Sequence, residues 1–155
     1  MDTDAGADIA WHRVKYRAMG ITVSAFGFRP LLPFVAGLMF GATTRRDHPE
    51  VIREARAMIA RNHVPSARRC LEALMRRDSV VERLPEIDAP ALVVVGEEDR
   101  MLPPPLSRRI QKGLVDASFV MIPGAGHLTA IEQPERVNAA LLAFLATLAN
   151  RPPRE

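Results

Sequence analysis

An aspartate and a histidine each stand in a turn that follows a short apolar run. Asp99 comes shortly after the run 91–95, and His127 comes shortly after the run 118–122. A carboxylate beside an imidazole holds the ring in one orientation and stabilises its protonated form, so that the ring can act as a general base. Asp99 and His127 are therefore candidate catalytic residues if the elements before them bring the two side chains together.

The two apolar runs predict buried strands of a parallel sheet, because short, fully apolar strands are typical of sheets covered on both faces. Helical patterns over 103–114 and 134–149 follow the two runs, and a strand–helix–strand–helix order favours a parallel sheet. The carboxyl ends of neighbouring parallel strands lie at one edge of the sheet, where α/β proteins bind their ligands. We therefore expect Asp99 and His127 to lie close together at that edge.

The first half of the chain is predicted to be helical. One helix is expected around 11–19, another begins near Asp47, and a third begins at Pro65, since proline is tolerated in a first turn. The inner face expected for this third helix consists of Ala67, Cys70, Leu71, Leu74 and Met75. The apolar stripe expected on the helix over 134–149 consists of Val137, Leu141, Leu142, Phe144, Leu145 and Leu148.

The segment 28–42 is the most apolar part of the chain. Its uncharged run, residues 30–44, is shorter than the roughly 20 apolar residues that a membrane-spanning helix needs. Pro30 and Pro33 also interrupt it. We expect a buried or interfacial segment and no membrane partner, and membrane association through this segment is the weaker alternative.

The composition predicts one soluble globular domain, with 155 residues, 48% of them hydrophobic and 25% charged. The net charge is +3, and the arginine pairs are scattered among acidic residues, so no nucleic-acid partner is expected. Cys70 is the one cysteine and allows no disulfide within the chain, which favours a reducing compartment. The acidic start does not resemble a secretory signal, so we expect a cytoplasmic protein. No metal or cofactor is expected, because neither a Cys/His cluster nor a phosphate-binding glycine loop is present in the sequence.

Two stretches of the sequence resemble a known family. "APALVVVGEEDRMLPP" and "FVMIPGAGHLTAIEQPERVNAALLAFL" are similar to the C-terminal part of an α/β-hydrolase, over about residues 87–148. In that family the last two core strands carry the acid and the histidine of a Ser–Asp–His triad. The resemblance implies that Asp99, at the fourth position of G-x-x-D, is this acid, and that His127, after G-x-G, is this histidine.

The same resemblance implies the fold and its division. It predicts an α/β protein that is a C-terminal fragment of an α/β-hydrolase fold, with a helical cap region followed by the last two parallel strands and their helices. Residues 1–86 would form the helical cap-like region, 87–150 the C-terminal β-α-β-α portion of the core, and 151–155 a polar tail. Four residues are candidates for lining the substrate pocket, and they are Trp11, Met39, Phe40 and Leu128.

The serine of the triad has no counterpart in this sequence. The family's nucleophile lies in G-x-S-x-G ahead of the acid, whereas Ser24, Ser66 and Ser79 have no such surroundings. Cys70 is a poor substitute, because a cysteine on the apolar face of a helix is usually inert. We therefore interpret the chain as the cap and C-terminal half of a serine hydrolase, truncated and expected to be inactive by itself.

The complete enzyme is expected to hydrolyse an ester, a lactone or a similar small substrate without a cofactor. Its expected partners are that small molecule and either the N-terminal half or another chain. The alternative is a truncated, non-catalytic paralogue that acts as a partner-binding or half-enzyme subunit.

Overall fold

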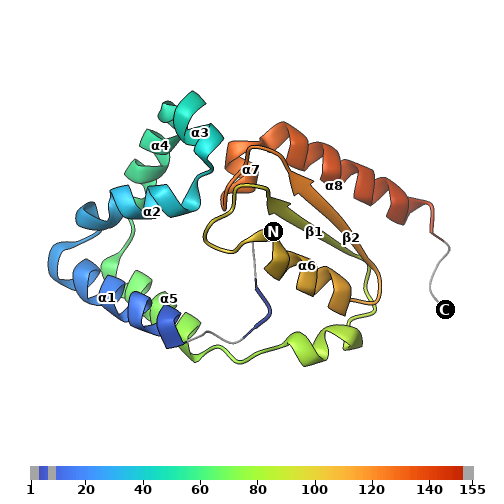
Figure 1. Ribbon diagram of the computed structural model, residues 1–155, viewed down its shortest axis with the longest axis horizontal. Coiled ribbons are helices and arrows are strands. Elements are labelled where there is room, and N and C mark those ends of the chain that lie inside the picture. The colour runs from blue at the N-terminus through green and yellow to red at the C-terminus, as the bar shows by residue number, and fades with distance from the viewer. Residues whose placement is uncertain (1–3, 7–9, 152–155) are drawn as a thin grey trace.

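A helical region and a small sheet flanked by helices make up the fold (Figure 1). The computed structural model describes residues 4–6 and 10–151. In the helical region the elements are α1 (Ala10–Phe26), the 3-10 turn η1 (Arg29–Leu31), α2 (Leu32–Met39), α3 (Ala42–Asp47), α4 (Pro49–Ala60), α5 (Val64–Arg76) and the 3-10 turn η2 (Val81–Glu86). In the sheet region they are β1 (Ala91–Gly96), α6 (Pro104–Gly113), β2 (Ala117–Ile122), α7 (Thr129–Glu132) and α8 (Pro134–Ala149).

Proline marks the beginning of most helices. It stands in the first turn of α2, α4, α5, α6 and α8, where its missing N–H has no intrahelical partner to lose. The strands and helices predicted in the second half are confirmed, with bounds shifted by a residue or so. The apolar segment 28–42 folds into η1, α2 and the start of α3. No helix of the described ranges is both long and apolar enough to cross a membrane.

The sheet consists of β1 and β2, which pair in parallel with Ala91 opposite Ala117 and Gly96 opposite Ile122. Successive side chains of a strand point to opposite faces, and α6 and α8 cover the two faces of this sheet. The α8 face holds Val94, Ile122, Ala125 and Val137. The α6 face holds Val93 and Ile110, together with Leu84 from η2 and Ala5.

A third apolar cluster joins the helical region to the loop after β2. Its buried members are Ala36, Phe40, Ile52 and Ala55, and Leu128 packs against it from the histidine loop. Close packing of this kind removes apolar surface from water and fixes how the two regions sit relative to each other. The helical region therefore supports the loop that carries the candidate histidine.

Two helices bury less of their apolar faces than the sequence pattern predicts. On α5, Cys70 is exposed and Leu74 is 40% exposed, so the predicted inner face is wrong for these two residues. The physical reason is that α5 packs mainly against α1, and none of the described residues of α5 is buried. On α8, Val137 is buried but Leu142 is 67% exposed, because only one side of this helix meets the sheet.

Candidate active site

The loops after β1 and β2 are bound directly to each other at the carboxyl ends of the strands. The backbone N–H of Glu97 donates to the carbonyl of Ile122 at 3.0 Å, and that of Glu98 donates to the carbonyl of Ala125 at 2.8 Å. Gly96 ends β1 at a close backbone approach, because a Cβ there would overlap the carbonyl of Ala125. The parallel pairing therefore continues past the strands and brings the two candidate residues to one place.

Asp99 and His127 are in contact, as the order of strands and loops predicted. Asp99 Oδ2 lies 2.9 Å from His127 Nδ1. The Asp99 side chain is 0% exposed and the His127 side chain is 16% exposed. A carboxylate on Nδ1 favours the ring form that carries its hydrogen there, which makes Nε2 the basic nitrogen of the neutral imidazole.

The other oxygen of Asp99 is occupied by the backbone of its own loop. Oδ1 accepts hydrogen bonds from the N–H of Met101 at 2.8 Å and of Leu102 at 2.9 Å. Because an aspartate commonly bonds to the backbone two residues on, this turn forms locally. It fixes the carboxylate in one rotation and aims Oδ2 at His127.

The histidine loop makes a tight turn and then rests on the helical region. Gly124 adopts a φ of 69°, which glycine tolerates without strain. The N–H groups of His127 and Leu128 both donate to the carbonyl of Met39, at 2.8 and 3.2 Å. The end of α2 therefore supports the backbone of His127.

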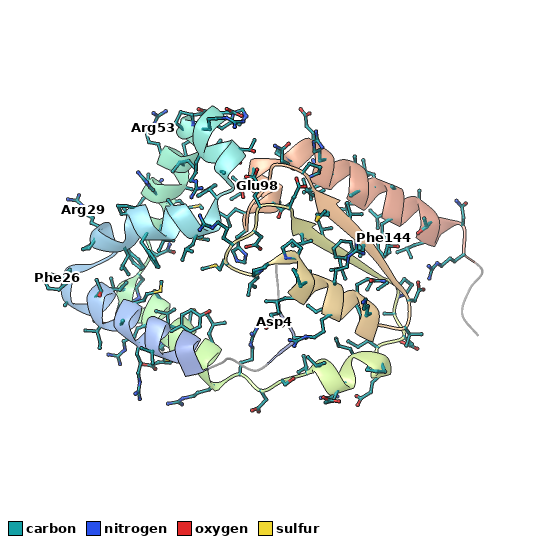
Figure 2. The ribbon with its side chains drawn as sticks, in the orientation of Figure 1. Asp4, Phe26, Arg29, Arg53, Glu98 and Phe144 are labelled. Atoms are coloured by element: carbon teal, nitrogen blue, oxygen red, sulfur yellow. The ribbon has the colours of Figure 1, made fainter. Side chains whose placement is uncertain are left out.

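Two further carboxylates, not singled out in the sequence, bind the helical region to these loops. Glu98, which lies where the helical region meets the strand loops (Figure 2), accepts the N–H of Thr43 at 2.8 Å and its hydroxyl at 2.6 Å. These bonds, with the Thr43 hydroxyl as the largest cause, lower the pKa of the Glu98 carboxyl from its ordinary value of 4.5. Glu132 is 7% exposed and accepts the N–H of Gly41 at 2.8 Å.

Sequence reasoning missed both residues, because the backbone groups that these carboxylates bind cannot be recognised in the sequence. Glu98 is indistinguishable in sequence from its exposed neighbour Glu97, and only the position of Thr43 makes one of them a backbone acceptor. Glu132 does carry a weak signal, because it is a charged residue in the short segment between His127 and Pro134. Its backbone partners could not be inferred from that signal.

The four candidate pocket residues occupy different surroundings. Phe40 is 1% exposed inside the cluster of Ala36, Ile52 and Ala55. Met39 and Leu128 are half-buried beside the same cluster. Trp11 belongs to α1, but its side chain lies outside the described part of the structure. A role in lining a substrate pocket stays a prediction for all four.

A large hollow lies elsewhere, between α1 and α5. Its volume is about 1170 Å³, and Asp99 and His127 are not among its lining residues, which include Val14, Tyr16, Gly20 and Leu71. Ser24 lines this hollow, Ser66 lies in the first turn of α5, and Ser79 precedes η2. In the described residues, no group of three or more His, Cys, Asp or Glu side chains is placed to hold a metal ion.

The model of the alpha/beta hydrolase family matches residues 4–140. This chain belongs to the α/β-hydrolase family. The predicted family and fold class are therefore confirmed, and the helices with two parallel strands agree with the C-terminal part of that fold.

Known proteins similar to this family member include a thermophilic esterase from Thermogutta terrifontis, solved with malate bound. The two structures have a TM-score of 0.89 and 30% sequence identity, and the match covers 94% of this chain and 54% of the esterase. A provisionally named non-heme bromoperoxidase of Mycobacterium tuberculosis is 42% identical over 69 residues, which are 43% of this chain and 26% of the relative.

A third relative is a 2-hydroxy-6-oxononadienedioate/2-hydroxy-6-oxononatrienedioate hydrolase from Paraburkholderia phymatum. It is 44% identical over 63 residues, which are 41% of this chain and 22% of the relative. The chain thus spans about half the length of the esterase chain, and its alignments to the two curated relatives cover about a quarter of their lengths.

Proposed function

We propose that this chain supplies the acid and the histidine of a serine-type hydrolase that acts on an ester, a lactone or a similar small substrate. The observation that carries the proposal is the partly buried contact between Asp99 Oδ2 and His127 Nδ1, 2.9 Å long, at the carboxyl ends of two parallel strands. Membership of the α/β-hydrolase family supports it. So does the likeness to proteins named as an esterase and as a hydrolase.

In the proposed reaction His127 acts on the hydroxyl group of a serine. Among the described residues, no serine stands in a G-x-S-x-G turn. Nε2 of His127 removes the hydroxyl proton while the serine oxygen attacks the carbonyl carbon of the substrate. Asp99 stabilises the resulting imidazolium. The imidazolium then returns the proton to the departing alkoxide, which leaves an acyl-serine and a free alcohol.

Hydrolysis of the acyl-serine repeats the same proton transfers with water. Nε2 takes a proton from a water molecule, the hydroxide adds to the acyl carbon, and the serine oxygen leaves with the proton from His127. The carboxylic acid is released and the serine is restored.

A non-catalytic, partner-binding role is the second candidate. Leu142 is 67% exposed and Leu145 is 49% exposed on α8, and clustered exposed leucines commonly mark a surface that another polypeptide covers. The same surface would serve a half-enzyme subunit. This candidate requires no contribution from His127 to any reaction rate.

The deciding experiment is an assay of short p-nitrophenyl esters with the protein as the genome encodes it, including any segment in frame before Met1. We expect His127→Ala and Asp99→Asn each to reduce kcat by about 10⁴-fold. Glu97→Gln, on the exposed neighbour in the same loop, is the matched control and is expected to leave the rate unchanged. The proposal is wrong if His127→Ala leaves the esterase rate unchanged.

A further inference from the structure

We propose that Glu132 is a positioning residue, which holds the backbone on both sides of His127 and ties it to the connection between α2 and α3. The inference rests on the proposed function for its catalytic meaning, but its structural content can be tested without a substrate. According to this proposal, the buried side chain of Glu132 positions His127, the candidate general base.

The carboxylate of Glu132 lies at the end of α7 and is almost fully removed from water, at 7% exposure. No ion pair of Glu132 is present among the described residues. Burial of a carboxylate costs free energy unless hydrogen bonds compensate for the lost water. The hydrogen-bond partners of Glu132 therefore indicate which parts of the backbone this side chain holds in place.

Those partners are three backbone N–H groups. Oε1 accepts from Gly126 at 2.9 Å and from Leu128 at 3.1 Å, the residues immediately before and after His127. Oε2 accepts from Gly41 at 2.8 Å. Hydrogen bonds to an ionised acceptor are about twice as strong as those between neutral groups, so this one side chain firmly holds three N–H groups on two segments of backbone.

The N–H of His127 itself completes the arrangement. It donates to the carbonyl of Met39 at 2.8 Å, two residues before Gly41. Three consecutive N–H groups of the histidine loop are thus fixed. Glu132 holds that of Gly126, Met39 holds that of His127, and both accept that of Leu128. With the backbone held on both sides, only the rotation of the His127 side chain is left, and Asp99 fixes that rotation.

The acid loop is bound to the same connection. Glu98, the residue before Asp99, accepts the N–H and the hydroxyl of Thr43. Residues 39–43 therefore bind both of the loops that carry Asp99 and His127. Gly126 allows this approach, since a Cβ there would lie 2.7 Å from the carbonyl carbon of Phe40.

Only a carboxylate satisfies all three donors at once. In Glu132→Gln the amide oxygen can accept either the two loop N–H groups or that of Gly41, and the amide NH₂ then faces the N–H group or groups left over. The geometry therefore makes a selective prediction. Glu132→Gln keeps the hydrogen bonds either to the histidine loop or to Gly41 and loses the others, whereas Glu132→Ala loses all of them.

The test uses NMR of the full chain and its variants Glu132→Gln, Glu132→Ala and Glu135→Gln. Glu135 is exposed in the first turn of α8, so its variant is a control with the same change in charge. Hydrogen exchange is measured at the amides of Gly41, Gly126 and Leu128. The proton shared between Asp99 and the His127 ring is followed by its downfield resonance, assigned with His127→Gln.

In Glu132→Ala we expect exchange about ten- to a hundredfold faster at Gly41 and Gly126, together with loss of the downfield resonance. The increase at Leu128 should be smaller, because its N–H also donates to the carbonyl of Met39. In Glu132→Gln we expect this acceleration at Gly41 alone or at the loop pair alone. Glu135→Gln is expected to match the parent chain. Because the glutamine variant changes so few atoms, it keeps the test decisive if the alanine variant does not fold.

Two failures can be told apart. If the parent chain itself lacks the downfield resonance, the Asp99–His127 pair and the proposed function are wrong. If the parent chain has the resonance and a folded Glu132→Ala keeps both the resonance and slow exchange at Gly41 and Gly126, then only the role of Glu132 is wrong. Acceleration at both Gly41 and Gly126 in Glu132→Gln would also contradict the selective hydrogen bonding that the geometry requires.

Discussion

Asp99 divides its two carboxylate oxygens between His127 and its own loop. Oδ2 lies 2.9 Å from Nδ1 of His127, and Oδ1 accepts the N–H groups of Met101 and Leu102. The loop bonds therefore decide which oxygen faces the ring. They also determine which atom of the side-chain amide faces the ring when Asp99 is changed to asparagine.

In Asp99→Asn we expect the amide oxygen to keep the two loop hydrogen bonds, which places the NH₂ group against Nδ1 of His127. Nδ1 must then accept, so the neutral ring carries its hydrogen on Nε2 and cannot act as a base there. The ¹⁵N shifts of the His127 ring should report this change of tautomer. Glu97→Gln in the same loop should not change the shifts, and an unchanged tautomer in Asp99→Asn would contradict the geometry.

Glu98 is expected to make stability depend on pH in the acidic range. Its folded pKa lies below the ordinary value of 4.5, chiefly because the hydroxyl of Thr43 donates to it. In this range the unfolded chain binds more protons, so stability rises with pH. The contribution is complete above about pH 4.5 and is lost as the pH falls through the folded pKa.

Urea unfolding of Glu98→Gln and Glu97→Gln measures this contribution. At about pH 7 we expect Glu98→Gln to lower the free energy of unfolding by about 1–2 kcal/mol, because hydrogen bonds to a charged acceptor are lost. The difference from the parent chain should shrink as the pH falls below 4.5. A difference that stays constant with pH, or an equal loss in Glu97→Gln, would argue against this role.

Gly126 is expected to tolerate no side chain. A Cβ there would lie 2.7 Å from the carbonyl carbon of Phe40 and would overlap the nitrogen of Gly41. Gly126→Ala should therefore lower the free energy of unfolding by about 1–3 kcal/mol or more, because the backbone of the loop or of the α2–α3 connection must shift.

Gly20 offers the matched control for this substitution. It lies within α1, and the nearest atom that a Cβ there would meet among the described residues of other elements is Leu71 Cδ1, at 4.0 Å. Gly20→Ala should raise the free energy of unfolding by up to about 1 kcal/mol, since alanine favours the helix over glycine. Thermal unfolding of both variants measures the contrast, and similar effects at the two positions would refute it.

The two sides of α8 are expected to respond differently to truncation. Val137 is 6% exposed and packs on the sheet, whereas Leu142 is 67% exposed. Val137→Ala should cost about 1–3 kcal/mol of stability because it leaves a cavity, and Leu142→Ala should cost less than about 0.5 kcal/mol. Denaturant unfolding checks both values.

Leu142 also tests the partner-binding alternative. If another polypeptide or a second copy covers this side of α8, Leu142→Lys should weaken the association while leaving the fold intact. Sedimentation of the purified chain over a range of concentrations measures self-association. A parent chain that stays monomeric throughout would rule out the second copy as the covering partner.

Much of the fold and the central pair could be predicted from local patterns. The apolar runs before Asp99 and His127 predicted two strands, and the helices between and after them favoured a parallel pairing. Parallel neighbours end at the same edge, so the contact between the two residues followed from topology. The buried faces of α5 and α8 were less predictable, because periodicity shows which side of a helix is apolar and not how much of it is covered.

The sequence by itself determined the family, the order of the elements and the Asp99–His127 pair, since each depends on residue types and spacing within about 60 residues, roughly the length of a strand–helix–strand–helix unit. Only the tertiary structure decided that Glu132 holds Gly41, which is 91 residues away, and that Glu98 holds Thr43, which is 55 residues away. A backbone N–H has no sequence signature, because every residue except proline carries one. Which carboxylate it meets depends on how the two regions pack.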